Sequence, residues 1–104
     1  SIANIVYSNK SNCTAEELAN VGIAYFALAG QSKEINAKQQ FDYINRAIEC
    51  CNAAETADAD VAKEIYEKSG KDIASLKAKY TEKLPDYEKA ANDSTSIKVK
   101  VNVK

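Results

Sequence analysis

The chain has 104 residues, a length that corresponds to a single domain. Hydrophobic residues make up 45% of it and charged residues 28%, which is typical of a globular protein and argues against disorder. The net charge of −1 predicts no binding to nucleic acid or to an anionic membrane surface, and the absence of histidine excludes histidine-dependent catalysis and histidine-ligated zinc or haem.

Residues 1–13 are predicted to be an extension ahead of a helical core. The β-branched and apolar residues between Ser1 and Tyr7 favour a short strand. Thr14 and Glu17 have the spacing of a capping box, so a helix is expected to begin there and to end at Gly30. Apolar residues recur in this helix at steps of three and four on two faces, which predicts packing on two sides. The two series are Leu18, Val21, Tyr25 and Leu28, and Ala15, Ala19, Gly22, Phe26 and Ala29.

A second helix with two apolar sides is predicted from Ala37, and a third helix from Asp58 or Asp60. The third helix has a single apolar stripe, formed by Val61, Ile65, Ile73, Leu76, Tyr80 and Leu84. We expect this stripe to carry through Gly70, and we expect Pro85 to cause a kink or a break. The sequence therefore predicts an all-α fold with three main helices over residues 14–91.

The last residues, 92–104, are predicted to be a linker followed by a strand or a loose tail. Apolar and polar residues alternate strictly after the linker, which is the pattern of a half-buried strand. Its apolar residues are Ile97, Val99, Val101 and Val103. A single strand needs a partner, so it is expected either to pair with the N-terminal segment or to form a homodimer with a second copy.

The spacing of Leu18, the pair Val21 and Gly22, and Tyr25 resembles the first helix of a tetratricopeptide repeat, and the pair Ala47 and Ile48 fits its second helix. The resemblance covers residues of about 14–55. It departs from the family in a connection over 32–39 that is too long and in Gln40, which stands where the family has a small residue. The alternative is an unrelated three-helix bundle.

The resemblance implies that the third helix caps the hairpin and that the first helix binds a protein or peptide partner. The residues expected on that binding face are Glu16, Asn20, Ile23 and Phe26. The alternative is that Ile23 and Phe26 pack on the third helix or on neighbouring repeats. In either case Gly22 is expected where the first two helices approach most closely, with Tyr25 and Phe41 filling the space between them.

The three cysteines offer one candidate crosslink. A hairpin that bends near residues 31–34 brings Cys13 close to Cys50 and Cys51, so a disulfide from Cys13 to one of them is expected, and it would indicate an exported or periplasmic protein. The alternative is three reduced thiols, with Cys51 as a small core residue. No CxxC spacing is present, so neither a metal site nor a redox site is predicted.

No catalytic, cofactor-binding or metal-binding residue is predicted. The carboxylates of Glu16, Glu17, Asp58 and Asp60 lie at helix starts, where capping accounts for them. Because the chain has no methionine, it is expected to be a piece of a larger protein or a processed product. We therefore expect a non-enzymatic protein-interaction or scaffold module, or alternatively a small structural protein that dimerises through its C-terminal strand.

Overall fold

A computed structural model describes the backbone of residues 2–103 and the side chains of residues 2–93. The described backbone is helical and contains no strand, so the all-α prediction is confirmed. Residues 2–103 form five α-helices and one short 3-10 helix, η1, instead of the three main helices expected. The elements are α1 (Ile2–Ser8), η1 (Lys10–Asn12), α2 (Ala15–Ala29), α3 (Ala37–Ala57), α4 (Ala59–Lys68) and α5 (Ile73–Val103).

Helices α2 and α3 form an antiparallel hairpin, and each begins with a capping box. The Thr14 hydroxyl accepts a hydrogen bond from the Glu17 amide at 3.1 Å, and the Glu17 carboxylate accepts one from the Thr14 amide at 2.8 Å. Asn36 and Gln39 repeat this exchange at 2.8 and 3.0 Å. Each box satisfies amides that would otherwise lack partners, which places the helix starts at Ala15 and Ala37.

The hairpin is closest at Gly22, as expected. A Cβ atom added there would lie 2.5 Å from the Cys51 Sγ, 3.2 Å from the Cys51 nitrogen and 3.3 Å from the Ala47 carbonyl oxygen. Tyr25 is 1% exposed beside this crossing, which confirms its place between the helices. Phe41, however, is only half-buried and lies toward α5 instead of between α2 and α3.

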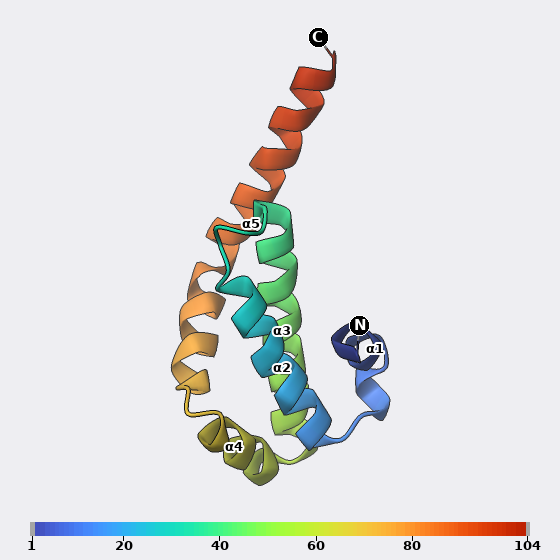
Figure 1. Cartoon of the computed structure of the whole chain (residues 1–104), viewed down its shortest axis with the longest axis vertical. Coiled ribbons are helices and arrows are strands. Elements are labelled where there is room, and N and C mark those ends of the chain that lie inside the picture. The colour runs from blue at the N-terminus through green and yellow to red at the C-terminus, as the bar shows by residue number, and fades with distance from the viewer. Residues whose placement is uncertain (1, 104) are drawn as a thin grey trace.

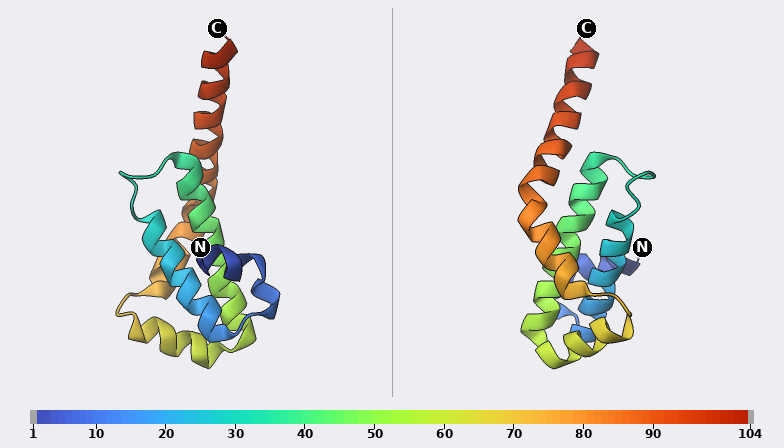
Figure 2. Two further views of the ribbon diagram at one scale, coloured as in Figure 1. Left: turned by 45° about the vertical axis from the view of Figure 1, so that its right-hand side comes forward. Right: turned by 90° about the vertical axis from the view of Figure 1, so that its left-hand side faces the viewer.

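The expected third helix is two helices, because the chain turns at Gly70. Gly70 has φ = +72°, a conformation that glycine adopts at little cost, and the turn ends α4. The Asp72 carboxylate then accepts a hydrogen bond from the Ser75 amide at 3.0 Å and so caps the start of α5. Figure 2 shows α4 lying across the end of the hairpin and α5 running back beside α3.

Pro85 does not break α5, which continues through it to Val103. Proline has no amide hydrogen, so the Thr81 carbonyl cannot accept the usual hydrogen bond from the residue four positions later. Helices bend where this ladder is interrupted. Figure 1 shows the axis of α5 changing direction in its orange stretch, so the predicted kink is present and the predicted break is not.

The expected β pairing of the two ends is wrong. Residues 2–8 form α1, because Ala3, Val6 and Tyr7 recur at helical spacing and pack against the core. The backbone of residues 97–103 continues α5, so it does not pair as a strand with the N-terminal segment. Figure 1 also shows the two ends far apart. The side chains of Ile97, Val99, Val101 and Val103 lie outside the described ones.

The core has two parts joined along the hairpin. The larger part lies between α2, α3 and α5 and includes Tyr25, Ile44 and Ile73. The smaller part lies where α4 crosses α2 and α3, and its buried residues are Leu18, Ala19, Ala54 and Ala62. Among the described side chains no buried polar atom lacks a hydrogen-bond partner. This packing fixes the position of α5 on α3, where the candidate site lies.

Candidate functional site

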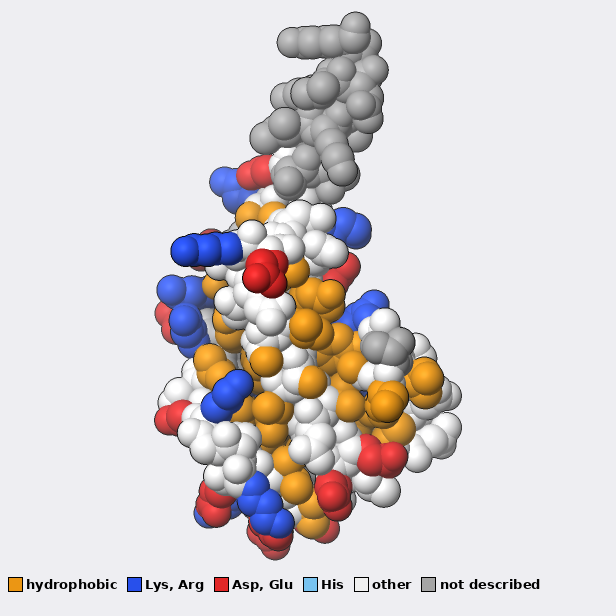
Figure 3. Space-filling view, viewed as in Figure 1, with side chains coloured by type: hydrophobic (Ala, Val, Ile, Leu, Met, Phe, Trp, Pro, Cys, Tyr) orange, Lys and Arg blue, Asp and Glu red, His pale blue; other side chains and the backbone are white. Residues whose placement is uncertain are grey.

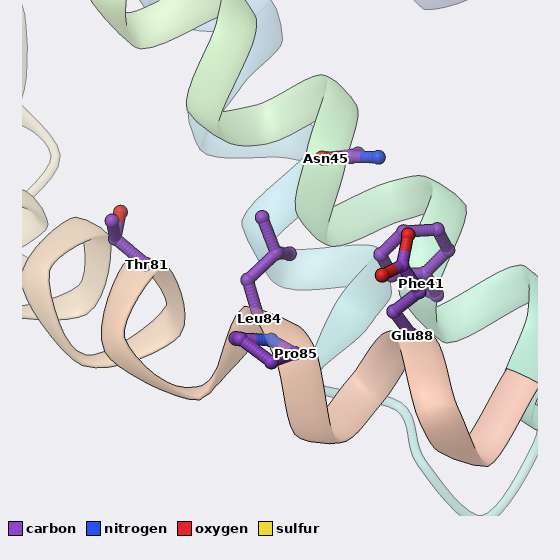
Figure 4. A pocket seen from close by; sticks show the side chains of 6 residues that line it. All are labelled: Phe41, Asn45, Thr81, Leu84, Pro85 and Glu88. Carbon is purple, nitrogen blue, oxygen red and sulfur yellow. The ribbon is translucent and has the colours of Figure 1, made fainter.

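A hollow of about 270 Å³ opens between α3 and α5 at the level of Pro85. Two of its lining residues belong to α3 and four to α5, so the hollow lies along the seam between the two helices (Figure 4). The lining residues are Phe41, Asn45, Thr81, Leu84, Pro85 and Glu88. We refer to this site as the α3–α5 groove. The residues recur at steps of three and four along each helix, which places them on facing sides.

The α3–α5 groove is lined by both apolar and polar side chains, and the polar ones are Asn45, Thr81 and Glu88. Phe41 and Leu84 are half-buried, so each shows part of its apolar surface in the groove. The Glu88 side chain is exposed and forms no ion pair with another described residue. Because Pro85 has no amide hydrogen, it cannot donate the usual helical hydrogen bond to the Thr81 carbonyl. The groove therefore combines apolar surface with a carboxylate, an amide and a hydroxyl group.

A polar network attaches α1 to the hairpin. Arg46 on α3 donates to the Asn4 side-chain oxygen at 2.8 Å and to the Tyr25 hydroxyl at 3.4 Å, and the Tyr25 hydroxyl donates to the same Asn4 oxygen at 2.7 Å. The Arg46 guanidinium also lies 4.7 Å from the centre of the Tyr7 ring. The hydrogen bond to Tyr25 raises the pKa of Arg46 above its usual value.

Sequence analysis did not identify this network, although Arg46 is the only arginine among the 14 basic residues. Tyr7 extends the network by donating to Glu49 at 2.9 Å, and Lys10 lies 3.7 Å from the same carboxylate oxygen. Burial and the bond to Glu49 raise the pKa of Tyr7. These hydrogen bonds and the ion pair hold α1 against the hairpin.

Figure 3, drawn from the same side as Figure 1, shows hydrophobic side chains gathering over the middle and right of the molecule, where α1, α2 and α3 lie.

A second network connects α3, α4 and α5. The Tyr66 hydroxyl lies 2.8 Å from the Glu55 carboxylate and 3.3 Å from the Cys51 carbonyl oxygen, and it can donate to either. Lys77 donates to the other Glu55 oxygen at 2.6 Å and to Asn52 at 2.9 Å. Burial, together with these acceptors, raises the pKa of Tyr66. Both Glu55 oxygens are occupied by donors within the fold, so this group fixes the three helices relative to one another.

The three cysteines are free thiols in the structure, and the expected disulfide is not formed. Cys13 is half-buried, and its thiol donates to the Asn9 carbonyl oxygen at 3.3 Å. Cys50 and Cys51 are fully buried in the core. Burial raises the pKa of Cys50 to about 11 and also raises that of Cys51. These two thiols therefore carry little thiolate at neutral pH, and Cys51 is the small core residue of the alternative interpretation.

The partner-binding face expected on the first helix is only partly open. Glu16 and Asn20 are exposed, but Ile23 is half-buried and Phe26 is 4% exposed. The Phe26 ring stacks on that of Tyr80 in α5, with 5.7 Å between the ring centres. Phe26 therefore packs on a later helix, as the alternative interpretation expected, and the four residues do not form one accessible surface.

The described residues contain no group of three or more metal-ligating side chains. None of the helices in the described part is both long enough and apolar enough to cross a membrane. Comparison with known protein families, with characterised proteins and with solved structures finds no significant match. The resemblance to a tetratricopeptide repeat thus rests on residue spacing alone.

Proposed function

We propose that the chain is a non-enzymatic helical interaction module and that a protein or peptide partner binds in the α3–α5 groove. The observation that carries this proposal is the pair Phe41 and Leu84, two large apolar side chains that face each other from different helices across an open hollow. Exposed apolar surface that is concave and rimmed by polar groups is typical of interaction sites.

The size of the groove favours a side chain over a small molecule. Sites for drug-sized ligands occupy roughly 300–1,000 Å³ and bury most of the ligand. The α3–α5 groove, at about 270 Å³, lies below that range and is open to solvent. It fits one long side chain of a partner whose backbone lies across the two helices.

Other surfaces and groups are weaker candidates. Ile2 and Ile5 are more exposed, at 79% and 64%, but both project from the single short helix α1. Both oxygens of the partly buried Glu55 carboxylate accept hydrogen bonds from Tyr66 and Lys77, which connect α3, α4 and α5. The groove brings exposed apolar surface of two large side chains, Phe41 and Leu84, together with the carboxylate of Glu88.

A displayed library of random peptides, selected on the immobilised chain, tests the proposal. Enriched peptides should bind the wild-type chain and lose at least about tenfold in affinity with Phe41→Ser, because that change removes the apolar wall of the groove. Ile5→Ser is the matched control, an equivalent change on α1 that should leave binding unchanged. Circular dichroism should show that both variants remain folded. Failure to enrich any sequence, or equal binding to Phe41→Ser, refutes the proposal.

A further inference from the structure

We infer that Asn12 is an acceptor site for N-linked glycosylation, an inference that does not depend on the α3–α5 groove. The sequence contains three triplets of the form Asn-x-Ser/Thr, the pattern required by the enzyme that attaches such glycans. Two of them follow one another between α1 and α2, at residues 9–11 and 12–14, and the third lies in α5, at residues 92–94. The asparagine of each triplet is exposed, so exposure alone does not distinguish them.

The backbone conformation favours the triplet that begins at Asn12. The enzyme recognises the acceptor amide together with the hydroxyl two residues later, so both groups must be reachable from one side. Cys13 and Thr14 are extended, with φ and ψ of −99° and 157° and of −76° and 159°. Side chains two residues apart lie on the same side of an extended backbone. The conformation of this stretch therefore favours a common face for the Asn12 amide and the Thr14 hydroxyl.

The other two triplets have a helical backbone. Lys10 and Ser11 belong to η1, and residues 92–94 continue α5. A helical backbone separates side chains that are two residues apart, so it does not present an amide and a hydroxyl together. The Asn9 amide nitrogen is also engaged, because it donates to the Ile5 carbonyl oxygen at 2.9 Å. In the described part of the chain the Asn12 side chain forms no such bond.

The segment that carries Asn12 is reachable in the folded chain. Neither α1 nor η1 contributes a buried residue, so the segment lies on the outside of the fold. Exposed connections of this kind are where modification of a folded chain is tolerated best. Figures 1 and 2 show the segment on the side of the hairpin away from α5. A glycan on Asn12 therefore leaves the α3–α5 groove open to a partner.

The reaction is a transfer of an oligosaccharide from a polyisoprenyl pyrophosphate carrier. The Asn12 side-chain nitrogen attacks C1 of the first sugar, and a bond forms between this nitrogen and C1. The bond between C1 and the pyrophosphate oxygen breaks, and the lipid pyrophosphate leaves. One amide proton passes to a base of the transferring enzyme. The step involves no oxidation or reduction, and the rest of the chain keeps its covalent structure.

The test is synthesis of the full chain behind a cleavable secretory leader in a cell-free system with microsomes, which hold the lipid-linked donor. The wild-type chain should give a band of lower gel mobility that treatment with peptide N-glycosidase removes. This glycosidase leaves aspartate in place of the asparagine that carried the glycan. Mass spectrometry should therefore find aspartate in place of Asn12 after treatment.

Two variants remove the acceptor in different ways. Asn12→Gln removes the asparagine itself and should abolish the shifted band. Thr14→Asp removes the hydroxyl but keeps an oxygen acceptor that caps α2, so it should abolish the band while the helix start is preserved. Asn20→Gln, the same exchange at an exposed asparagine outside the triplets, is the matched control and should leave the band unchanged. Circular dichroism should show that all three variants remain folded.

Three results would overturn the inference. The first is the absence of a band that responds to the glycosidase. The second is conversion to aspartate at Asn9 or Asn92 but not at Asn12, and the third is a shifted band that persists in both Asn12→Gln and Thr14→Asp. Conversion at Asn12 supports the inference whether or not a second asparagine is also converted.

Discussion

Substituting Gly22 with alanine should destabilise the fold, even though alanine is the better helix former. In isolation the change would favour α2 by about 1 kcal/mol. In the structure, however, the new Cβ atom would meet the Cys51 Sγ at 2.5 Å, and the Cys51 nitrogen and Ala47 carbonyl oxygen at 3.2 and 3.3 Å. The sulfur can rotate only within a fully packed core, and the other two atoms belong to the backbone of α3.

The cost of the close contacts at Gly22 should outweigh the gain in helix propensity that alanine brings. Relief of the contacts requires α2 and α3 to move apart, and overpacking of this kind costs about 1–3 kcal/mol. The expected net loss in the free energy of unfolding is about 1 kcal/mol, and one kcal/mol corresponds to a drop in Tm of roughly 4–8 °C for a domain of this size. Gly22→Leu, with three more carbon atoms at the same point, should be more damaging still.

Thermal and urea unfolding followed by circular dichroism measures this effect. Gly30→Ala is the matched control, because a Cβ atom at Gly30 meets only carbonyl oxygens at 3.4 and 3.7 Å and its backbone is already helical. That variant should gain about 0.4–1 kcal/mol. If Gly22→Ala is as stable as the wild-type chain, or more stable, the hairpin does not cross as described.

Four further outcomes are expected. Tyr66→Phe removes the hydroxyl donor to Glu55 and should cost about 1–2 kcal/mol in urea unfolding, and an unchanged midpoint would contradict the role of that network. Burial raises the pKa of Cys50 to about 11, so the folded chain holds this proton more tightly than the unfolded chain does. The free energy of unfolding should therefore fall as pH rises from about 9 to 11. Cys50→Ala should make this dependence on pH less steep. If the variant and the wild-type chain show the same slope, the assignment to Cys50 is wrong. A thiol reagent should find one reactive group, Cys13, in the folded chain and three in denaturant, whereas a single thiol in denaturant would establish the disulfide. Light scattering should give a monomer both for the full chain and for a version that ends at Asp93, and a dimer lost on truncation would favour the structural alternative.

The hairpin could be predicted because local chemistry and packing agree there. The Thr14 capping box, the glycine at the crossing and the start at Ala37 all follow from residue types at fixed spacing. The same box at Asn36 and Gln39 was present in the sequence and could have resolved the connection at 32–39. These features depend on neighbours within a few residues or on one interhelical contact.

The split between α4 and α5 could not be obtained from periodicity. The apolar stripe continues in phase across Gly70, so the spacing alone fits one helix as well as two. The break between α4 and α5 is determined by the positive φ of Gly70 and by the cap at Asp72, which together turn the chain. The prediction of a strand in the N-terminal segment was wrong for a similar reason. Val6 and Tyr7 favour a helix only when the hairpin provides a surface for them to pack on.

The candidate site was the least predictable feature. Phe41 and Leu84 both belong to apolar series, and nothing in those series distinguishes a covered position from an open one. Their exposure depends on the line along which α5 crosses α3. The burial of Phe26 was unpredictable for the converse reason, because the ring that covers it, Tyr80, belongs to a helix that is distant in sequence.

Pro85 is the one place where the described structure runs against a strong local rule. A proline inside a helix costs about 3 kcal/mol or more, since a hydrogen bond is lost and the ring clashes with the preceding turn. The capping residues of the other helices and the conformation of Gly70 agree with local preferences. Departures from local consistency are expected mainly at functional or strained sites. The departure in this chain lies on the wall of the α3–α5 groove, where Pro85 bends α5, so the local cost of Pro85 and the shape of the groove have the same origin.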